Sequence, residues 1–283
     1  MFMSTATASM PAAMERQHGF TLIEMTIVIV LLGVLSAIVA VFVKGPVDAY
    51  FSTVRRAALT DVADTTLRRM GRDLRSALPN SIRTPDPVGQ CLEFIPTKTG
   101  GRYRADVDAA SGGDTLDFSR ADASVGVLGS NDALPADQRI APGDVIAVYN
   151  LGIPGADAYL EDNVATVTAL TGESAAPVET GVTIAAKKFP LASASNRFQV
   201  IPANEKVVAY VCRDSNLYRT ASTTFSSACP SDGVMLARNV SACHFDYTSQ
   251  DLQRNALVRL MFEFTDRTET VSLLGEVHVN NTP

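Results

Sequence analysis

Histidine is scarce in this chain, and the motifs of common enzyme families are missing. The sequence has three histidines. The two that lie after its long apolar run, His244 and His278, fall in strand-like stretches, where an isolated histidine is usually structural. There is no Gly-x-Ser-x-Gly nucleophile elbow, no phosphate-binding loop and no His-Glu-x-x-His metalloprotease helix. We therefore expect no catalytic residue, no cofactor and no enzymatic activity. The opposing hypothesis is a membrane-anchored enzyme, which activity in the isolated C-terminal domain would support.

The sequence also lacks excess positive charge and metal-ligand spacing. The net charge is −6 and the isoelectric point is near 5.1, which argues against a nucleic-acid partner. No Cys-x-x-Cys is present, and Cys243-His244 alone would place its two side chains on opposite faces of a strand. The acidic stretch 106–117 lacks the spacing and the bidentate glutamate of an EF-hand calcium loop. We expect a solvated turn and no metal there, at Asp106, Asp108, Asp114 and Asp117.

Cysteine is limited to four residues, all of which lie after the apolar run: Cys91, Cys212, Cys229 and Cys243. An even number of cysteines on the exported side of a membrane fits oxidation to disulfides. Three pairings are open. We favour Cys212 with Cys229, which closes a modest loop and is worth about 3 kcal/mol on the loop-entropy model. Cys91 and Cys243 would then form the remaining pair.

Charge is almost absent from residues 20–43, where Glu24 is the single ionisable residue. As a helix this run would span roughly 36 Å at about 1.5 Å per residue, enough to cross a hydrocarbon layer of about 30 Å. In lipid, a helix also satisfies its own backbone hydrogen bonds. The run is longer than the 7–15 apolar residues of a cleaved signal peptide. We expect a transmembrane helix over 20–43; a buried soluble helix and a plain signal anchor are the alternatives.

The start of the apolar run reads Gly19-Phe20-Thr21-Leu22-Ile23-Glu24. A carboxylate inside a membrane normally has a partner, and the run itself contains no basic residue. Cleavage after Gly19 would create an α-amino group on Phe20, a cation at the depth of Glu24. Residues 1–19 would then be a leader that is removed, although its length leaves the true start codon open.

This motif resembles the processing site of type IV prepilins and of type II secretion pseudopilins. The resemblance implies that a prepilin peptidase cuts after Gly19 and methylates the new N-terminal residue, Phe20. It also implies that Glu24 pairs with the amine of a neighbouring subunit during filament assembly. The expected location is the bacterial inner membrane, crossed once with the globular domain in the periplasm, and then the pilus filament.

The helical pattern continues after the apolar run as an amphipathic extension over 44–78. Pro46 removes a helix hydrogen bond, so we expect a kink or locally unwound backbone there. Apolar residues recur at helical spacing up to Leu78, and Pro79 ends the helix. A basic face carries Arg68, Arg72 and Arg75. This face is either solvated or in contact with acidic faces of adjacent subunits.

A mainly antiparallel β domain is expected after the helix, which makes the fold class α+β. Residues 79–90 contain prolines and a glycine and are typical of a connector. Residues 91–283 are long enough for one domain with its own core, and stretches 121–142 and 152–162 have the composition of loops. The clearest predicted hairpin consists of strands 257–264 and 268–279, joined through Thr265-Asp266-Arg267. The predicted strands are 91–96, 101–107, 115–118, 144–149, 163–169, 182–185, 197–201, 206–212, 216–220, 234–236, 242–247, 257–264 and 268–279.

Several later segments are similar to minor pilins of the mannose-sensitive haemagglutinin (MSHA) pilus, of the MshO type. They are residues 68–80, 91–96, 148–152, 237–243 and 277–283. This resemblance implies a minor pilin that joins or primes a pilus, with other pilins, the inner-membrane assembly platform and membrane lipid as partners. Alternatives are a J-type minor pseudopilin of type II secretion, or an adhesive tip module whose loops 121–142 or 213–232 bind a surface glycan.

Overall fold

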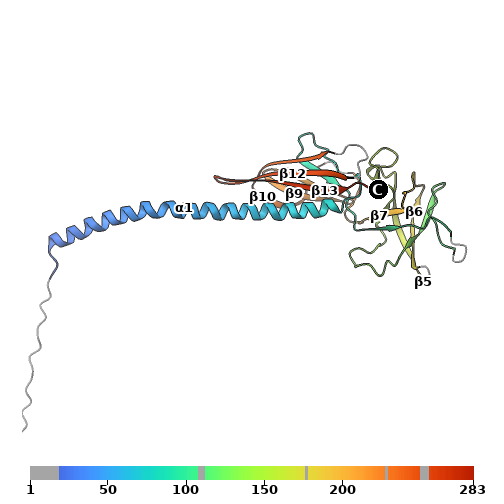
Figure 1. Cartoon of the computed structure of the whole chain (residues 1–283), viewed down its shortest axis with the longest axis horizontal. Coiled ribbons are helices and arrows are strands. Elements are labelled where there is room, and N and C mark those ends of the chain that lie inside the picture. The colour runs from blue at the N-terminus through green and yellow to red at the C-terminus, as the bar shows by residue number, and fades with distance from the viewer. Residues whose placement is uncertain (1–18, 108–111, 176–177, 227–228, 249–254) are drawn as a thin grey trace, which may run out of the picture. The chain divides into compact units, whose positions relative to one another are not determined.

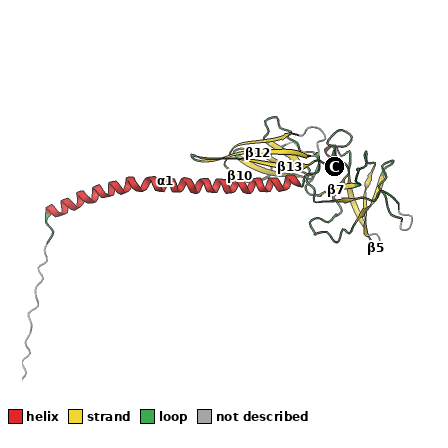
Figure 2. Cartoon of the chain, viewed as in Figure 1, coloured by secondary structure: helices red, strands yellow, loops and turns green. Residues whose placement is uncertain are grey.

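The computed structural model describes residues 19–107, 112–175, 178–226, 229–248 and 255–283 (Figure 1). The leader expected over 1–19 therefore lies outside the described residues, apart from Gly19. The chain divides into two compact units, Met1–Val54 and Arg55–Pro283. One long helix succeeded by antiparallel sheets confirms the predicted α+β fold class (Figure 2).

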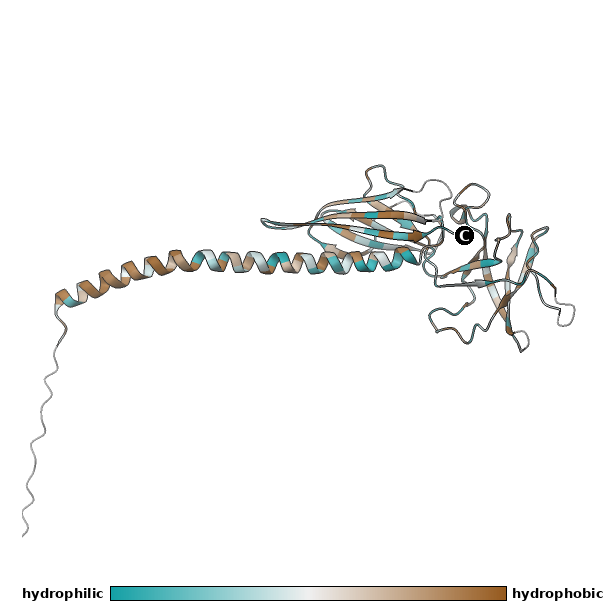
Figure 3. Ribbon diagram, in the orientation of Figure 1, coloured by the Kyte–Doolittle hydropathy of each residue, from teal (hydrophilic) through white to brown (hydrophobic). Residues whose placement is uncertain are grey.

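Helix α1 (Leu22–Arg75) is a single element of 54 residues. It is apolar in its first half and mixed in its second, as the colours of Figure 3 show. The helix continues unbroken through Pro46, so the prediction of locally unwound backbone there is wrong. An interior proline removes one hydrogen bond, and the turns on either side can still hold the backbone helical. A kink within the unbroken helix stays a prediction.

The helix ends at Arg75, three residues before the predicted end at Leu78. Backbone hydrogen bonds to the sheet take over at this point: Leu78 N–H donates to the Ile95 carbonyl at 2.7 Å, and Ala77 forms a β-bridge with Pro96. The Ser76 hydroxyl also donates to the Asp73 carbonyl at 2.8 Å. Tertiary pairing therefore terminates the helix before Pro79 does.

Among the described residues of Arg55–Pro283, the strands form three antiparallel sheets, and a short 3₁₀ helix η1 (Ala158–Leu160) lies between two strands. The first has the order β1-β8-β9-β10, with β1 Cys91–Phe94, β8 Val207–Arg213, β9 Asn216–Ser222 and β10 Val234–Arg238. The second has the order β11-β12-β13, with β11 Val240–Thr248, β12 Asn255–Asp266 and β13 Glu269–Asn280. The third has the order β2-β7-β4-β5-β6-β3, with β2 Thr99–Arg102, β7 Arg197–Ile201, β4 Val145–Ala147, β5 Val164–Ala175, β6 Val178–Lys187 and β3 Asp122–Leu128.

The predicted hairpin at the C-terminal end is confirmed, since β12 and β13 pair in register from Asn255–Asn280 to Asp266–Glu269. Two predictions in the middle of the chain are wrong. Residues 115–118 form no strand, whereas β3 lies inside the stretch 121–142 that the sequence predicts as a loop. Strand β3 is half exposed and pairs with β6, some 50 residues later, so its stability depends on a partner that local sequence does not reveal.

The second half of α1 forms part of the main core. Leu59, Ala63, Met70 and Leu74 pack in one buried cluster with side chains of β8, β11, β12 and β13. Close packing also constrains the sheet, because a Cβ on Gly275 would come within 2.8 Å of Leu67. A second buried cluster, which includes Phe189, Phe198 and Val200, packs on the six-stranded sheet. The helix from residue 55 onward is thus fixed to the β domain by apolar burial.

Candidate processing and assembly site

The first turn of α1 contains a capping box made by Thr21 and Glu24. Thr21 directly precedes the helix, and its Oγ1 accepts a hydrogen bond from Glu24 N–H at 3.3 Å. In return, Thr21 N–H donates to Glu24 Oε2 at 3.4 Å. This reciprocal Thr-x-x-Glu pattern satisfies two backbone donors that a helix start leaves unpaired. The carboxylate also lies at the positive end of the helix dipole.

The predicted cleavage bond between Gly19 and Phe20 lies at the accessible end of this turn. Phe20 is 77% exposed, and a Cβ on Gly19 would meet no atom within 4 Å. Packing within the described chain therefore does not require glycine at this position. A requirement for glycine would have to come from a protein that binds this segment.

The apolar half of α1 has exposed side chains along its length. Every residue from Leu22 to Phe51 is exposed, and α1 is the one described helix that is long and apolar enough to cross a membrane. An apolar surface of this extent needs an apolar environment, either lipid or other helices. Glu24 lies at its start, and no described residue presents a cation to its carboxylate. The helix suggests a membrane anchor.

A polar network of four residues ties the other half of α1 to the first sheet. Asp73 accepts hydrogen bonds from the Tyr210 hydroxyl at 2.6 Å and from Arg219 Nε at 3.1 Å. Arg219 also binds both oxygens of Glu205, at 2.9 and 3.0 Å. Burial, together with the neighbouring Asp73, raises the pKa of Tyr210, and hydrogen bonds from Arg219 lower the pKa of Glu205. The network pairs all three charges at a partly buried position.

The disulfide pairing differs from the prediction. Cys91 bonds to Cys229 and Cys212 bonds to Cys243, with sequence separations of 138 and 31. The favoured pairs, Cys212–Cys229 and Cys91–Cys243, are therefore wrong. Cys91 and Cys212 lie on the paired strands β1 and β8 but are out of register, since Cys91 faces Val211. Each of these two cysteines therefore bonds to a cysteine on its own side of the sheet, and the length of the closed loop does not decide which cysteines pair.

Sequence reasoning missed the buried carboxylate of Glu93, next to the first disulfide. Glu93 Oε2 is 3.0 Å from both Nε and Nη2 of Arg83, and its Oε1 accepts a hydrogen bond from Cys229 N–H at 2.9 Å. Cys91, Glu93 and Cys229 are the one cluster of three potential metal ligands among the described residues. Both sulfurs are bonded to each other in the disulfide, so the cluster links β1 covalently to the segment around Cys229 and offers no thiolate to a metal. An acidic residue inside the predicted strand 91–96 was the available signal.

In the described part of the acidic stretch predicted as a turn, Asp114 and Asp117 have different surroundings. Asp117 accepts hydrogen bonds from the Ser119 hydroxyl and backbone and from Arg120. These bonds lower the pKa of Asp117 to about 2. Asp114 borders a groove near Arg104 and Glu179, and Asp108 lies outside the described residues.

The two histidines and the basic face are all at the surface. His244 Nδ1 lies 3.2 Å from the Val88 carbonyl oxygen, and His278 is exposed on β13. Arg68 forms an ion pair with Asp64 at 2.8 Å, one helical turn earlier. Arg72 and Arg75 border a groove against β12 and β13. A solvated face and a subunit contact both fit this arrangement.

Comparison with known proteins finds the prokaryotic N-terminal methylation motif at residues 14–40. This segment contains Gly19, Phe20 and Glu24 and most of the apolar run. No curated protein and no solved structure matches the chain. The motif indicates a type IV pilin-like or pseudopilin precursor, and it implies processing by a prepilin peptidase in the context of pilin assembly.

Proposed function

We propose that the chain is a minor pilin of the MshO type, cleaved by prepilin peptidase and then incorporated into, or used to prime, an MSHA-type pilus. One observation carries the proposal: the methylation motif coincides with a capped, exposed and apolar helix start at residues 19–24. The β domain after α1 is the part that would face the periplasm. The similarity of segments such as 68–80 and 277–283 to MSHA minor pilins supports the finer assignment.

Glu24 would drive assembly by electrostatic pairing. A carboxylate is disfavoured by about 2.5–3.5 kcal/mol at the centre of a membrane and by less near its edge. The 3.4 Å bond from Thr21 N–H compensates the charge weakly. Cleavage after Gly19 produces a cationic amine on Phe20, and the amine of a neighbouring subunit would pair with Glu24 far more strongly than a backbone N–H does. The exposed apolar face of α1 would then exchange lipid for neighbouring helices.

Mass spectrometry of the N-terminus tests the processing step. We expect membrane-purified protein from wild-type cells to begin at N-methylated Phe20, and protein from cells without the peptidase to retain residues 1–19. Gly19→Val should block cleavage. Gly33→Ala is the matched control, because a Cβ at residue 33 would also meet no atom within 4 Å. Uncleaved protein in wild-type cells would overturn the proposal.

A J-type minor pseudopilin is the second candidate, because it shares the same cleavage motif and anchor. The two functions differ in the system to which the protein would belong: pilus biogenesis or type II secretion. Deletion of the gene should reduce surface pili and leave type II secretion unchanged; loss of secretion with normal piliation would favour the pseudopilin. The identity of the neighbouring genes, for pilus biogenesis or for type II secretion, would distinguish the same two functions.

A further inference from the structure

The two disulfides interleave along the chain. Cys91 bonds to the third cysteine, Cys229, and Cys212 bonds to the fourth, Cys243. Neither bond therefore joins two cysteines that follow each other in the sequence. Four cysteines allow three pairings, so folding has to select one pairing against two alternatives.

The two disulfides lie on opposite sides of the first sheet. Cys91 belongs to a small buried cluster that includes Val211, and Cys229 packs against it. Cys212 and Cys243 belong to the main core. Val211 and Cys212 are consecutive on β8, so their side chains point to opposite faces. Every bond of the two alternative pairings would join one side of the sheet to the other, which requires the backbone to move.

Loop length favours these wrong bonds while the chain is unfolded. The loops closed by Cys229–Cys243 and by Cys212–Cys229 are shorter than both native loops, whose cysteines are 31 and 138 residues apart. The probability of closing a flexible loop falls with about the 3/2 power of its length, so roughly one chain in six would form a native bond first. A wrong first bond leaves two cysteines whose own bond is also wrong.

The native disulfides are shielded by the fold. Cys91 is 1% exposed, and Cys212 and Cys243 are each 8% exposed. An external thiolate must reach a sulfur atom to attack a disulfide. A chain with a bond across the sheet cannot complete this packing, so its sulfurs stay accessible. Burial therefore distinguishes the native pairing from the two alternatives.

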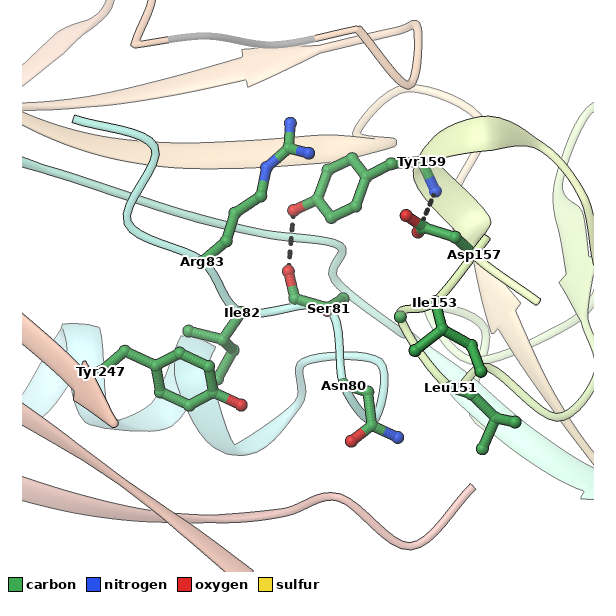
Figure 4. A pocket seen from close by; sticks show the side chains of 10 residues that line it. Asn80, Ser81, Ile82, Arg83, Leu151, Ile153, Asp157, Tyr159 and Tyr247 are labelled. Atoms are coloured by element: carbon green, nitrogen blue, oxygen red, sulfur yellow. Dashed lines mark hydrogen bonds between the residues drawn. The ribbon is translucent and has the colours of Figure 1, made fainter. Parts of the chain in front are cut away.

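Polar contacts fix the surroundings of the first disulfide. Glu93 accepts a hydrogen bond from Cys229 N–H through Oε1 at 2.9 Å, and its Oε2 is 3.0 Å from Nε and Nη2 of Arg83. Figure 4 shows Arg83 beside the ring of Tyr159, 3.6 Å from its centroid. The Tyr159 hydroxyl donates to the Ser81 carbonyl at 2.9 Å. The bond from Cys229 N–H is available only when Cys229 lies next to β1, as it does in the native pairing.

From these relationships we propose that the protein is a substrate of a thiol–disulfide isomerase, an enzyme with a reactive cysteine thiolate. In a chain with Cys229–Cys243 and Cys91–Cys212 bonds, the enzyme thiolate attacks Cys243, which forms a mixed disulfide and releases the Cys229 thiolate. Cys229 then attacks Cys91 and releases the Cys212 thiolate. Cys212 attacks Cys243 in the mixed disulfide, which forms the second native bond and regenerates the enzyme thiolate. Two disulfides are present before and after, so no oxidant or reductant is consumed. The proposal does not depend on cleavage after Gly19.

The test uses the full chain in detergent. The protein is reduced in denaturant, returned to detergent and oxidised with diamide, which takes up the thiol hydrogens and becomes a hydrazine. Diamide is removed, a catalytic amount of reduced isomerase is added, and peptides are mapped without reduction. We expect native pairing in a minority of chains after diamide alone, and a rise of about threefold or more with the isomerase.

Two controls separate disulfide exchange from assistance with folding. An isomerase whose reactive cysteine is replaced by alanine should give no rise. The double variant Cys91→Ser with Cys229→Ser retains one possible disulfide, so the active isomerase should not increase its yield of protease-resistant protein. Protein that was never reduced should keep both native bonds when it is incubated with the isomerase.

Four results would overturn the proposal. They are native pairing in most chains after diamide alone, no rise with the active isomerase, an equal rise with the inactive enzyme, and a gain in yield by the double variant. The readout is the pairing of cysteines in purified protein, so failure of this proposal would leave the proposed role in a pilus untouched.

Discussion

The hydroxyl of Tyr210 donates a 2.6 Å hydrogen bond to Asp73 Oδ2, which joins the last turns of α1 to the middle of the first sheet. Tyr210 is fully buried on β8 and stacks near Phe94 of β1, with ring centroids 6.1 Å apart. Tyr210 and Asp73 are 137 positions apart in the sequence. This bond holds the second half of the helix in one rotation against the β domain, which sets the direction in which its exposed arginines point.

Removing the Tyr210 hydroxyl should destabilise the domain. Hydrogen bonds to charged groups contribute about 1.5–3 kcal/mol, so Tyr210→Phe should lower the free energy of unfolding by about that amount. Asp73→Ala should cost more, because it leaves the buried hydroxyl without an acceptor. Chemical denaturation measures both. Tyr218→Phe is the control, since the Tyr218 hydroxyl has no hydrogen bond among the described residues; equal stability of Tyr210→Phe and the control would contradict the expectation.

Stability should fall in acid partly through Glu205. Its pKa is lowered from the ordinary 4.5, mainly by the hydrogen bonds from Arg219. A carboxyl whose pKa is lower in the folded state stabilises the fold fully above its unfolded pKa. That contribution is lost as the pH falls through the folded value. Glu205→Gln should therefore reduce the slope of stability against pH below about 4.5, whereas Asp137→Asn should not. An unchanged slope in Glu205→Gln would show that the Arg219 contacts are not maintained in solution.

Glu24→Gln should separate processing from assembly. The amide keeps the size of the side chain and can still accept from Thr21 N–H, so the variant should be stable, inserted and cleaved. It loses the charge that would pair with the Phe20 amine, so we expect far less of it in sheared filaments. Immunoblots of membrane and filament fractions measure the ratio, with the exposed Glu161→Gln as the control. Normal incorporation of Glu24→Gln would contradict the proposed pairing.

The disulfide pairing can be checked by mapping peptides without reduction. We expect linked peptides containing Cys91 with Cys229 and Cys212 with Cys243. On the loop-entropy model, the separations of 138 and 31 residues correspond to about 5 and about 4 kcal/mol. Replacing each pair by serine should therefore destabilise the domain, and more for Cys91–Cys229. A Cys212–Cys229 peptide would contradict the structure.

Gly126→Ala should disrupt the buried ion pair of Arg104 and Glu179. A Cβ at residue 126 would overlap Glu179 Oε1, and the two charged side chains are each about 10% exposed. Breaking a buried pair typically costs about 3–5 kcal/mol, so we expect a loss approaching this size in denaturation. Gly45→Ala, where a Cβ would meet nothing within 4 Å, should show no loss. Comparable stability of both variants would mean that the pair rearranges freely.

Local patterns are enough to predict the helix and the terminal hairpin. Residues 20–43 are apolar with a single charge, and β12 and β13 are adjacent in the chain and joined by a short turn, so neither needs a distant partner. The strand β3 cannot be found in this way, because it pairs with β6 far along the chain. The predicted end of α1 is wrong for the same reason, since Leu78 pairs with Ile95.

The functional residues also fall into those that local sequence reveals and those that only distant contacts bring together. Gly19, Phe20 and Glu24 are recognisable because their pattern is contiguous, and the methylation motif covers it. The network of Asp73, Tyr210 and Arg219 carries no sequence signal of its own, because distant segments bring these residues together.

The amino-acid sequence by itself determined the apolar helix, the processing motif at its start and the antiparallel character of the domain after it, since these depend on neighbours within a few residues. Only the tertiary structure decided which cysteines pair, which residue anchors α1 and which charged side chains are buried together. Those outcomes depend on which segments, separated by up to 138 residues in the case of the first disulfide, meet when apolar surface is buried, and sequence spacing does not encode that geometry.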